Sequence, residues 1–336
     1  DNLRHFKKKT GVSIATVSRV LNGSENVRPS TRKKVMDVID KYDYTPNAFA
    51  RGMGLHSLKT IGILCADSSD LFLAKAVYFL EQELQANGYE SLLCCTGYNP
   101  DIKKNYLNLI LSKKVDSIIL VGSHFIGFNE DENQYIKDVS TQVPIMLLNA
   151  SFDHPNVYST LCDDYGTMFE AATEMIQSGI TDILYLYDSK SYSGLKKLHG
   201  FCDAMKEHNI PGFEKLIHFY DGNIEHLNEV ADFVARIATK GTSFHGIMTS
   251  DDSLAIGSIK YAQKKGIRIP EELSVMGYNN SMLTNCCTPE LTSVDNRLET
   301  LTHQLVQTLL GVLAGEEMPK KSIFSGKIIK RGTTLF

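Results

Sequence analysis

The spacing of apolar residues changes near residue 60, and this change divides the chain into two parts. Before it, apolar positions recur every three or four residues, which is the period of a helix with one buried face. This pattern predicts three short helices, over residues 3–10, 14–21 and 32–42. After it, short runs of consecutive apolar residues alternate with amphipathic stretches, as expected for parallel strands whose two faces are covered by helices.

The first two predicted helices and the tight link between them form a helix-turn-helix pattern. Gly11 interrupts the helical pattern, and Ser13 has the side chain of a helix N-cap. The buried stripe of the second helix consists of Val17, Val20 and Leu21, and the donors on its opposite face are Thr16, Ser18 and Arg19. Such a helix fits the major groove of DNA, which is about 12 Å wide. Arg19 is the best candidate for reading a base, because an arginine can donate two hydrogen bonds to one guanine.

The second part of the chain predicts two similar α/β lobes. Strands are predicted over residues 60–65, 91–95, 117–121, 145–148, 157–162, 182–187, 216–220, 246–248, 273–277 and 324–330. Helices are predicted over residues 74–87, 101–112, 166–178, 193–208, 227–239, 253–265 and 298–314. Two of the strands run into an Asp-Ser pair, at 66–70 and 187–191, which is a faint internal repeat. We therefore expect two doubly wound lobes whose strand ends face one cleft, joined by three crossovers.

The predicted fold class is an all-α helix-turn-helix head followed by an α/β core of two doubly wound lobes. The expected units are a DNA-binding head (1–46), a hinge helix with linker (47–59), a first lobe (60–161 with 291–319) and a second lobe (162–290 with 320–336). Gly52 and Gly54 fall within the hinge, and each costs a helix about 1 kcal/mol relative to Ala. The hinge helix should therefore be marginal by itself and ordered by a partner.

Charge is divided unevenly along the chain. Residues 1–59 contain 12 Lys and Arg against 5 Asp and Glu, whereas the remaining residues contain 23 against 34. A basic head on an acidic body suggests that the head meets phosphates and the body does not. No apolar run approaches the roughly 18 residues of a membrane span, and no signal peptide is visible, so we expect a cytoplasmic protein. The seven cysteines are odd in number and lack paired-ligand spacing, which is typical of reduced core residues.

The sequence contains no recognisable catalytic motif, neither a phosphate-binding glycine loop nor a nucleophile elbow nor a zinc-binding HExxH. We therefore expect neither an enzyme nor a bound cofactor or metal ion. Two rival classes stay open. One is a pure small-molecule-binding protein without a DNA function, which the basic head argues against. The other is an enzyme on a doubly wound fold, which no motif supports.

Three phrases of the head and hinge occur together. They are VSIATVSRVLNG at 12–23, RPSTRKKV at 28–35 and YTPNAFARGM at 44–53. In this order and spacing they closely resemble the lac repressor (LacI/GalR) family, and GIRIPEELSVMGYNN, TPELTSV and KRGTT extend the resemblance to the end of the chain. The resemblance implies a homodimeric repressor that binds a palindromic operator and has a core similar to periplasmic sugar-binding proteins. A small molecule between the lobes would control its DNA affinity.

The resemblance also implies which residues of the head meet DNA. Base contacts fall to Ile14, Ala15 and Arg19, and phosphate contacts suit Ser13, Thr16, Ser18, Asn22 and Arg32. The hinge residues implied are Asn47, Ala50 and Met53. Met53 stands where the family inserts a leucine into the minor groove, and it can act as a wedge or merely pack against the core. Lys7 replaces the usual alanine of the first helix, so its stem must extend outward or shift the angle between the helices.

In the cleft, the positions that match the family's ligand contacts are Asp70, Phe72, Asp163, Lys197, Asp251 and Asn279. Lys197 replaces an arginine, and Asn279 replaces a carboxylate. Carboxylate and amide groups around an aromatic side chain suit a polyhydroxy ligand such as a sugar, whereas an anion fits less well. Asp251 precedes a predicted helix, so it can equally be an N-cap.

Overall fold

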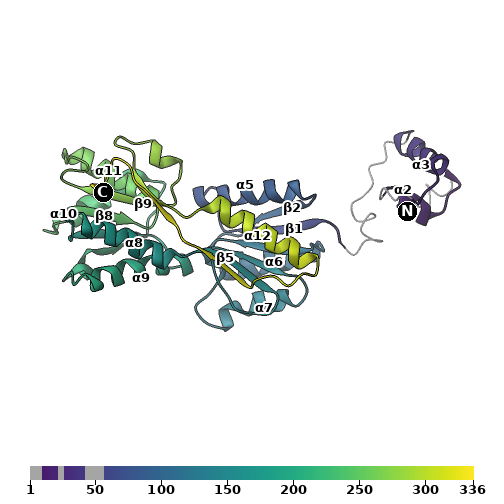
Figure 1. Ribbon diagram of the computed structural model, residues 1–336, viewed down its shortest axis with the longest axis horizontal. Helices are drawn as coiled ribbons and strands as arrows, with labels where there is room; N and C mark the ends of the chain where they lie inside the picture. The colour runs from purple at the N-terminus through teal and green to yellow at the C-terminus, as the bar shows by residue number, and fades with distance from the viewer. Residues whose placement is uncertain (1–9, 22–25, 42–56) are drawn as a thin grey trace.

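The computed structural model describes residues 10–21, 26–41 and 57–336, and Figure 1 shows the course of the chain. Its two regular parts are the helical head and the α/β core. Within the described residues, no helix is long and apolar enough to cross a bilayer.

The described head contains helices α2 (Ile14–Leu21) and α3 (Pro29–Lys41). Helix α3 starts three residues before the predicted start, because the fixed φ of Pro29 suits the first position of a helix. The small core of the head is formed by Val17, Val20, Val27 and Val35. The predicted helix at 3–10 lies outside the described residues except for Thr10, and so does the hinge segment at 47–54.

The first lobe is built on a six-stranded parallel sheet in the order β11-β5-β4-β3-β1-β2. Its strands are β1 (Thr60–Cys65), β2 (Glu90–Cys95), β3 (Ser117–Val121), β4 (Ile145–Leu148), β5 (Val157–Cys162) and β11 (Lys321–Phe324). Its helices are α5 (Leu71–Ala86), α6 (Pro100–Ser112), α7 (Gln134–Ser140) and α12 (Leu298–Leu313), with short 3-10 turns η1 (Ser123–Phe125) and η2 (Asp131–Asn133). Helices α5 and α12 pack on one face, through Leu80 and Leu305. Helices α6 and α7 pack on the other, through Leu107 and Ile136, which is why the central strands are apolar throughout.

The second lobe repeats this plan with strand order β12-β10-β9-β8-β6-β7. Its strands are β6 (Ile183–Tyr187), β7 (Ile217–Phe219), β8 (Gly246–Thr249), β9 (Ser274–Tyr278), β10 (Thr292–Asp295) and β12 (Lys327–Ile329), the last antiparallel to β10. Its helices are α8 (Asp164–Gln177), α9 (Tyr192–Glu207), α10 (Leu227–Thr239) and α11 (Asp252–Lys265), with 3-10 turns η3 (Phe213–Leu216) and η4 (Met282–Asn285). Helices α8 and α9 cover one face of the sheet through Met168 and Phe201, and α10 and α11 cover the other through Val234 and Ile259.

The chain passes between the lobes after β5, between β10 and α12, and between β11 and β12 (Figure 1). The single strand predicted at 324–330 has the wrong bounds, because Phe324 ends β11 in the first sheet and residues 327–329 form β12 in the second. The break comes at Gly326, where a Cβ would lie 2.7 Å from Thr167 Cγ2 and 3.1 Å from the carbonyl oxygen of Asp295.

Two of the expected lobe boundaries are wrong for the same reason. Strand β10 falls within the segment assigned to the first lobe but pairs with β9 in the second sheet. Strand β11 falls within the segment assigned to the second lobe but pairs with β5 in the first sheet. The chain therefore crosses to the first lobe only after completing β10, and returns to the second lobe only after completing β11.

Candidate DNA-binding head and interlobe cleft

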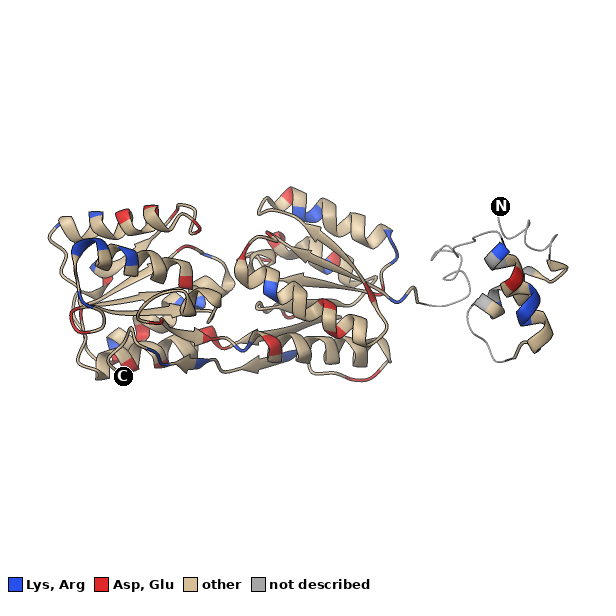
Figure 2. Ribbon diagram, turned by 90° about the horizontal axis from the view of Figure 1, so that it is seen from above, with Lys and Arg blue, Asp and Glu red and all other residues tan. Residues whose placement is uncertain are grey.

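Helix α2 presents one buried and one exposed face. Val17 and Val20 are buried against α3, while Ala15 and Arg19 are exposed. Ser13 acts as the N-cap, because its Oγ accepts a hydrogen bond from the Thr16 amide at 3.2 Å and lies 2.8 Å from Thr16 Oγ. Figure 2 shows Lys and Arg on the helices of the head. The predicted contacts Ser13, Ala15, Thr16 and Arg19 therefore lie along α2 or at its start.

The structure describes the remaining predicted DNA contacts only in part. Arg32 is partly buried within α3. The backbones of Ile14 and Ser18 belong to α2. Asn22, Asn47, Ala50 and Met53 lie outside the described residues, as does Lys7. Their roles remain predictions from the sequence.

The two sheets end at a common cavity, the interlobe cavity, of about 780 Å³. From the first lobe it is lined by Asp67, Asp70, Tyr98 and His124, and from the second by Asp188, Phe219, Tyr220 and Asp251. It continues into a narrower space of about 100 Å³ bounded by Phe72, Asn149, Ser193, Lys197 and Asn279. Most of these residues follow the carboxyl ends of strands, where ligands of doubly wound sheets bind.

Three carboxylates of the cavity are partly buried, and the loss of solvent around them raises the pKa of each. The carboxyl pKa of Asp70 is raised first by burial and then by the charge of Asp251. Burial also raises the pKa of Asp188, although its Oδ1 accepts a hydrogen bond from Ser250 Oγ at 3.0 Å. For Asp251, burial and the charge of Asp188 raise the pKa. The three groups come from both lobes, so their repulsion acts across the cleft.

Two of these carboxylates also cap helices. Asp70 Oδ1 accepts a hydrogen bond from the Leu73 amide at 2.8 Å at the start of α5. Asp251 Oδ1 accepts one from the Ser253 amide at 2.7 Å at the start of α11, while its Oδ2 accepts one from Asn279 Nδ2 at 2.9 Å. Asp251 is therefore a helix N-cap, as its position before a predicted helix allowed. Its second carboxylate oxygen, Oδ2, is directed at the cavity wall.

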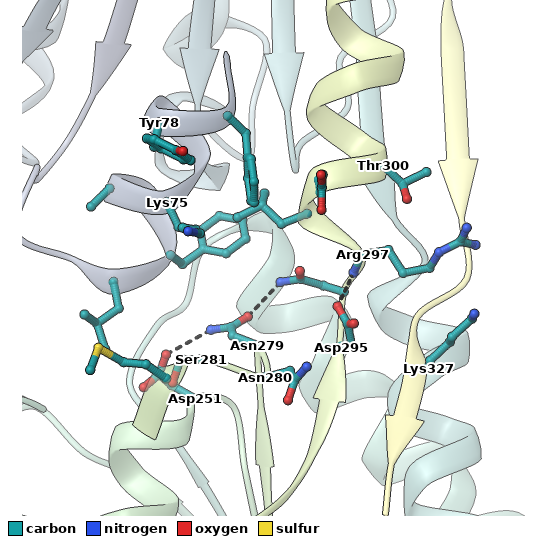
Figure 3. A pocket seen from close by; sticks show the side chains of 18 residues that line it. Lys75, Tyr78, Asp251, Asn279, Asn280, Ser281, Asp295, Arg297, Thr300 and Lys327 are labelled. Atoms are coloured by element: carbon teal, nitrogen blue, oxygen red, sulfur yellow. Dashed lines mark hydrogen bonds between the residues drawn. The ribbon is translucent and has the colours of Figure 1, made fainter. Parts of the chain in front are cut away.

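A series of hydrogen-bonded side chains connects Asp251, in the cavity wall, to a crossover between the lobes (Figure 3). Asn279 Nδ2 binds Asp251, and Asn279 Oδ1 accepts a hydrogen bond from Asn296 Nδ2 at 3.0 Å. Asn279 has φ of 96°, a left-handed conformation that Asn tolerates better than most residues. Asn296 lies in the crossover between β10 and α12, so the cleft and the crossover share one hydrogen-bond network.

Lys197 is buried at the narrow end of the cleft. Its Nζ donates to the carbonyl oxygen of Ser250 at 3.0 Å and lies 4.0 Å from the centroid of the Tyr278 ring. The ring face supplies a cation–π interaction that stabilises the ammonium group. Lys197 is thus held by the protein at the wall of the cleft.

Asp163 is placed differently from the other predicted cleft residues. Its Oδ1 caps α8 through the Gly166 amide at 2.9 Å, and its own amide donates to the carbonyl oxygen of Phe324 at 2.8 Å. These bonds fix it at the crossover between β5 and α8, away from the described lining of the interlobe cavity. The neighbouring Asp164 is the buried carboxylate, and it accepts hydrogen bonds from Ser193 Oγ and Tyr278 Oη.

The sequence reasoning missed several cleft residues. His124 is partly buried, and this desolvation together with the nearby charge of Lys103 lowers its pKa to about 4, so the ring is neutral at pH 7. Its ring lies edge-on to Tyr98, with centroids 4.8 Å apart. Ser123 Oγ donates to Ser191 Oγ of the second lobe at 2.7 Å, a direct bond between the lobes. His124 and Asp188 each follow shortly after a buried strand, and that position is the signal that would have found them.

Comparisons with known proteins agree with this architecture. The model for bacterial regulatory proteins of the lacI family matches residues 8–47, and the model for the periplasmic binding protein-like domain matches residues 172–334. An HTH-type transcriptional regulator of Lachnoclostridium phytofermentans is 49% identical over 335 residues, covering 100% of both chains. The regulator AscG of Escherichia coli is 28% identical over 331 residues, covering 98% of this chain and 96% of its own. The chain belongs to the lacI family of regulatory proteins.

Solved structures show the same fold. The lac repressor dimer bound to operator and the anti-inducer ONPF superimposes with a TM-score of 0.87 at 20% identity, covering 98% of both chains. The complex of the transcriptional regulator CelR with cellobiose superimposes with a TM-score of 0.71 at 20% identity, covering 98% of this chain and 99% of its own. At this identity the likeness concerns the fold.

Proposed function

We propose that this member of the lacI family is a cytoplasmic, homodimeric repressor that binds a palindromic operator and is controlled by a sugar-like molecule in the interlobe cavity. The observation that carries the proposal is the union, in one chain, of a capped helix with an exposed arginine and a two-lobed cleft lined by polar groups. No part of this function requires bond-making chemistry, so we propose a regulator without enzymatic activity.

The DNA-binding step follows from helix α2. Arg19 would donate two hydrogen bonds to a guanine, and the methyl group of Ala15 would contact a thymine methyl. Ser13 and Thr16 would position the helix on phosphates, because hydroxyl groups and helix N-termini are common phosphate donors. In the hinge, Met53 would wedge into the minor groove at the centre of the operator. A gel shift with a pool of palindromic DNA tests this step, and a chain that shows no sequence preference would instead fit the pure ligand-binding alternative.

The ligand-binding step follows from the strand ends. Carboxylate and amide oxygens accept hydrogen bonds from hydroxyl groups, and the rings of Tyr98 and Phe219 offer apolar faces to a sugar ring. The complex of CelR with cellobiose has the same fold and contains a sugar ligand. A thermal-shift screen of mono- and disaccharides on the full chain tests this step.

The homodimer is supported by apolar residues exposed at the first lobe. Strand β2 is an edge strand with exposed Leu92 and Leu93, and helix α5 exposes Leu71 and Tyr78. A bare edge strand with apolar side chains invites pairing with another chain. A two-fold dimer would also match the symmetry of a palindromic operator. Sedimentation of the full chain measures the oligomeric state directly.

A further inference from the structure

The interlobe cavity carries more negative charge than hydrogen bonding to hydroxyl groups requires. Its lining contains six acidic residues, namely Asp67, Asp70, Asp188, Asp221, Glu225 and Asp251. Among the same lining residues, all of them in the described part of the chain, there is no Lys or Arg. A concave site lined by one sign of charge focuses its potential and concentrates ligands of the opposite sign.

We propose that the ligand of this cavity is a polyhydroxy amine, a sugar-sized molecule whose protonated amino group is held between Asp70 of the first lobe and Asp188 and Asp251 of the second. The inference rests on the proposed function, since it takes the cavity as the effector site. It goes further, because it specifies that the effector carries a positive charge.

The positions of the acids on the two lobes explain why a cation would favour closure. Asp70 faces the cleft from the start of α5, whereas Asp188 and Asp251 face it from the ends of β6 and β8. Their mutual charges are among the causes that raise their pKa values: Asp251 acts on Asp70, Asp70 on Asp188, and Asp188 on Asp251. A neutral ligand would expel water and leave this repulsion less screened. An ammonium group would offset it.

The protein supplies little positive charge of its own to these acids. Lys197, at the narrow end of the cleft, acts through its charge to lower the pKa of Asp188 and Asp251, but its Nζ donates to the carbonyl oxygen of Ser250 and lies over the face of the Tyr278 ring. The Asp188 carboxylate accepts a hydrogen bond from the neutral hydroxyl of Ser250. His124 is neutral because its pKa is lowered to about 4. The negative charge of the cavity is thus only partly compensated from within.

The shape of the site favours an organic cation over a metal ion. Among the described residues, no group of three or more His, Cys, Asp or Glu side chains is arranged to hold a metal ion. The acids instead surround a volume of about 780 Å³, within the usual range for small-molecule sites. Aromatic rings share the wall, and the Phe219 ring already has Lys190 Nζ 4.7 Å from its centroid. An aromatic face of this kind also suits an ammonium group.

The test compares ligands that differ only in the substituent at C2 of each sugar ring. Binding of glucosamine and its β-1,4-linked dimer to the full chain is measured by calorimetry, alongside glucose, cellobiose and the N-acetylated forms of both amines. We expect each amine to bind at least ~10-fold more tightly than its hydroxyl and acetamide counterparts, with affinity that falls as salt rises, because screening weakens attraction between charges.

The matched variants alter the two ends of one strand. Asp188→Asn removes a carboxylate at the carboxyl end of β6 and retains an oxygen that can accept from Ser250 Oγ. Asp182→Asn makes the same charge change at the amino end of β6, where Asp182 binds His245 on the surface. We expect Asp188→Asn to weaken amine binding by about 10-fold and to weaken neutral-sugar binding by clearly less, while Asp182→Asn changes neither, because charge pairing acts over a short range in salt.

Three results would overturn the inference: no binding of either amine, equal or tighter binding of cellobiose or an acetamide, or amine binding that Asp188→Asn leaves unchanged. If a neutral sugar binds and alters operator affinity, the proposed regulator stands and only the amine requirement falls. If the chain shows no preference for any palindromic DNA, the proposed function falls, whichever ligand binds.

Discussion

At the scale of single residues, Asp252 combines burial with close neighbours that share its charge. It lies beside Asp251 at the start of α11, and its oxygens accept hydrogen bonds from Ser293 Oγ at 2.6 Å and the Ser281 amide at 2.7 Å. Burial, followed by the charge of Asp251, raises its pKa to about 7. The folded protein therefore binds a proton at Asp252 over a pH range in which the unfolded chain has lost it.

The expected consequence is a pH dependence of stability. Because the folded pKa exceeds the unfolded value, Asp252 makes the free energy of unfolding decrease as pH rises from about 4 to about 7. Over this window the contribution amounts to about a few kcal/mol. We expect Asp252→Asn to remove this contribution, so that the difference in unfolding free energy between variant and wild type changes steadily from pH 5 to pH 8. Urea denaturation at several pH values measures it, and a constant difference would contradict the assignment.

Arg19 is exposed on α2 and is the clearest candidate for reading a base. We expect Arg19→Ala to weaken operator binding by about 1–3 kcal/mol per half-site and to relax the preference at the contacted base pair. Lys34→Ala, at an exposed position of α3, is the matched control and should weaken specific and random DNA alike, if it acts at all. Competition gel shifts compare the two. A variant that keeps full preference for the operator would remove Arg19 from the readout.

Individual site residues could be predicted from the sequence where they follow a strand and resemble a known family. Asp70, Phe72, Lys197, Asp251 and Asn279 were found in this way, and the structure places them at the cleft. His124 and Ser123 were not found, because η1 positions them only after β3 has entered its sheet. Their position shortly after a buried strand was the local signal, but the contacts they make depend on tertiary packing.

At the scale of elements, the strand–helix alternation predicted most of the core, and the errors share a cause. Helix α7 was missed because its seven residues carry only a short apolar pattern. Strand β10 was missed because four residues with two hydroxyl side chains, Thr292 and Ser293, look like a loop. Strand β11 was missed apart from Phe324, and the predicted strand ran through Gly326 into β12, because the sequence between the two strands contains no proline and only one glycine. Short elements take their structure from neighbouring strands rather than from their own sequence.

The break between β11 and β12 gives an element-scale prediction. Gly326 packs against Thr167, and its amide donates to Thr167 Oγ1 at 3.0 Å. Because a Cβ here would meet Thr167 and the backbone of Asp295, we expect Gly326→Ala to lower the free energy of unfolding by about 1–3 kcal/mol. The exposed neighbour Ser325 is the control, and Ser325→Ala should change it by less than about 0.5 kcal/mol. Equal stability of the two variants in urea would show that the crossover has room to adjust.

At the scale of the whole molecule, hydrogen bonds connect the cleft to a crossover between the lobes. The hydrogen-bond chain from Asp251 through Asn279 to Asn296 joins the cavity to the crossover before α12. A ligand that changes the separation of the lobes would therefore act on the first lobe, which leads back to the hinge and head. Such coupling requires two lobe arrangements with different ligand affinities, and the contacts between the lobes set their balance.

The bond between Ser123 and Ser191 is the most direct of these contacts. Ser123 Oγ donates to Ser191 Oγ across the cleft, and Ser191 Oγ also accepts from Ser189 Oγ at 2.8 Å within the second lobe. Removing the donor from the first lobe should favour the open arrangement by about 0.5–1.5 kcal/mol, which is about a 2- to 12-fold change in the open population. Ser189→Ala is the matched control, because it removes a donor to the same hydroxyl without breaking a bond between the lobes.

We therefore expect Ser123→Ala to increase the radius of gyration of the ligand-free protein in X-ray scattering and to speed amide exchange across 123–126 and 192–195. Ser189→Ala should leave both unchanged. Because opening the lobes shifts the population away from the closed form, Ser123→Ala should also weaken effector binding, by at most the same factor, and reduce the ligand-induced change in operator affinity. The DNA affinity of the ligand-free protein then reports which arrangement the operator prefers. If Ser123→Ala changes scattering and effector affinity but leaves operator affinity untouched at every ligand concentration, lobe closure is not the signal that reaches the head.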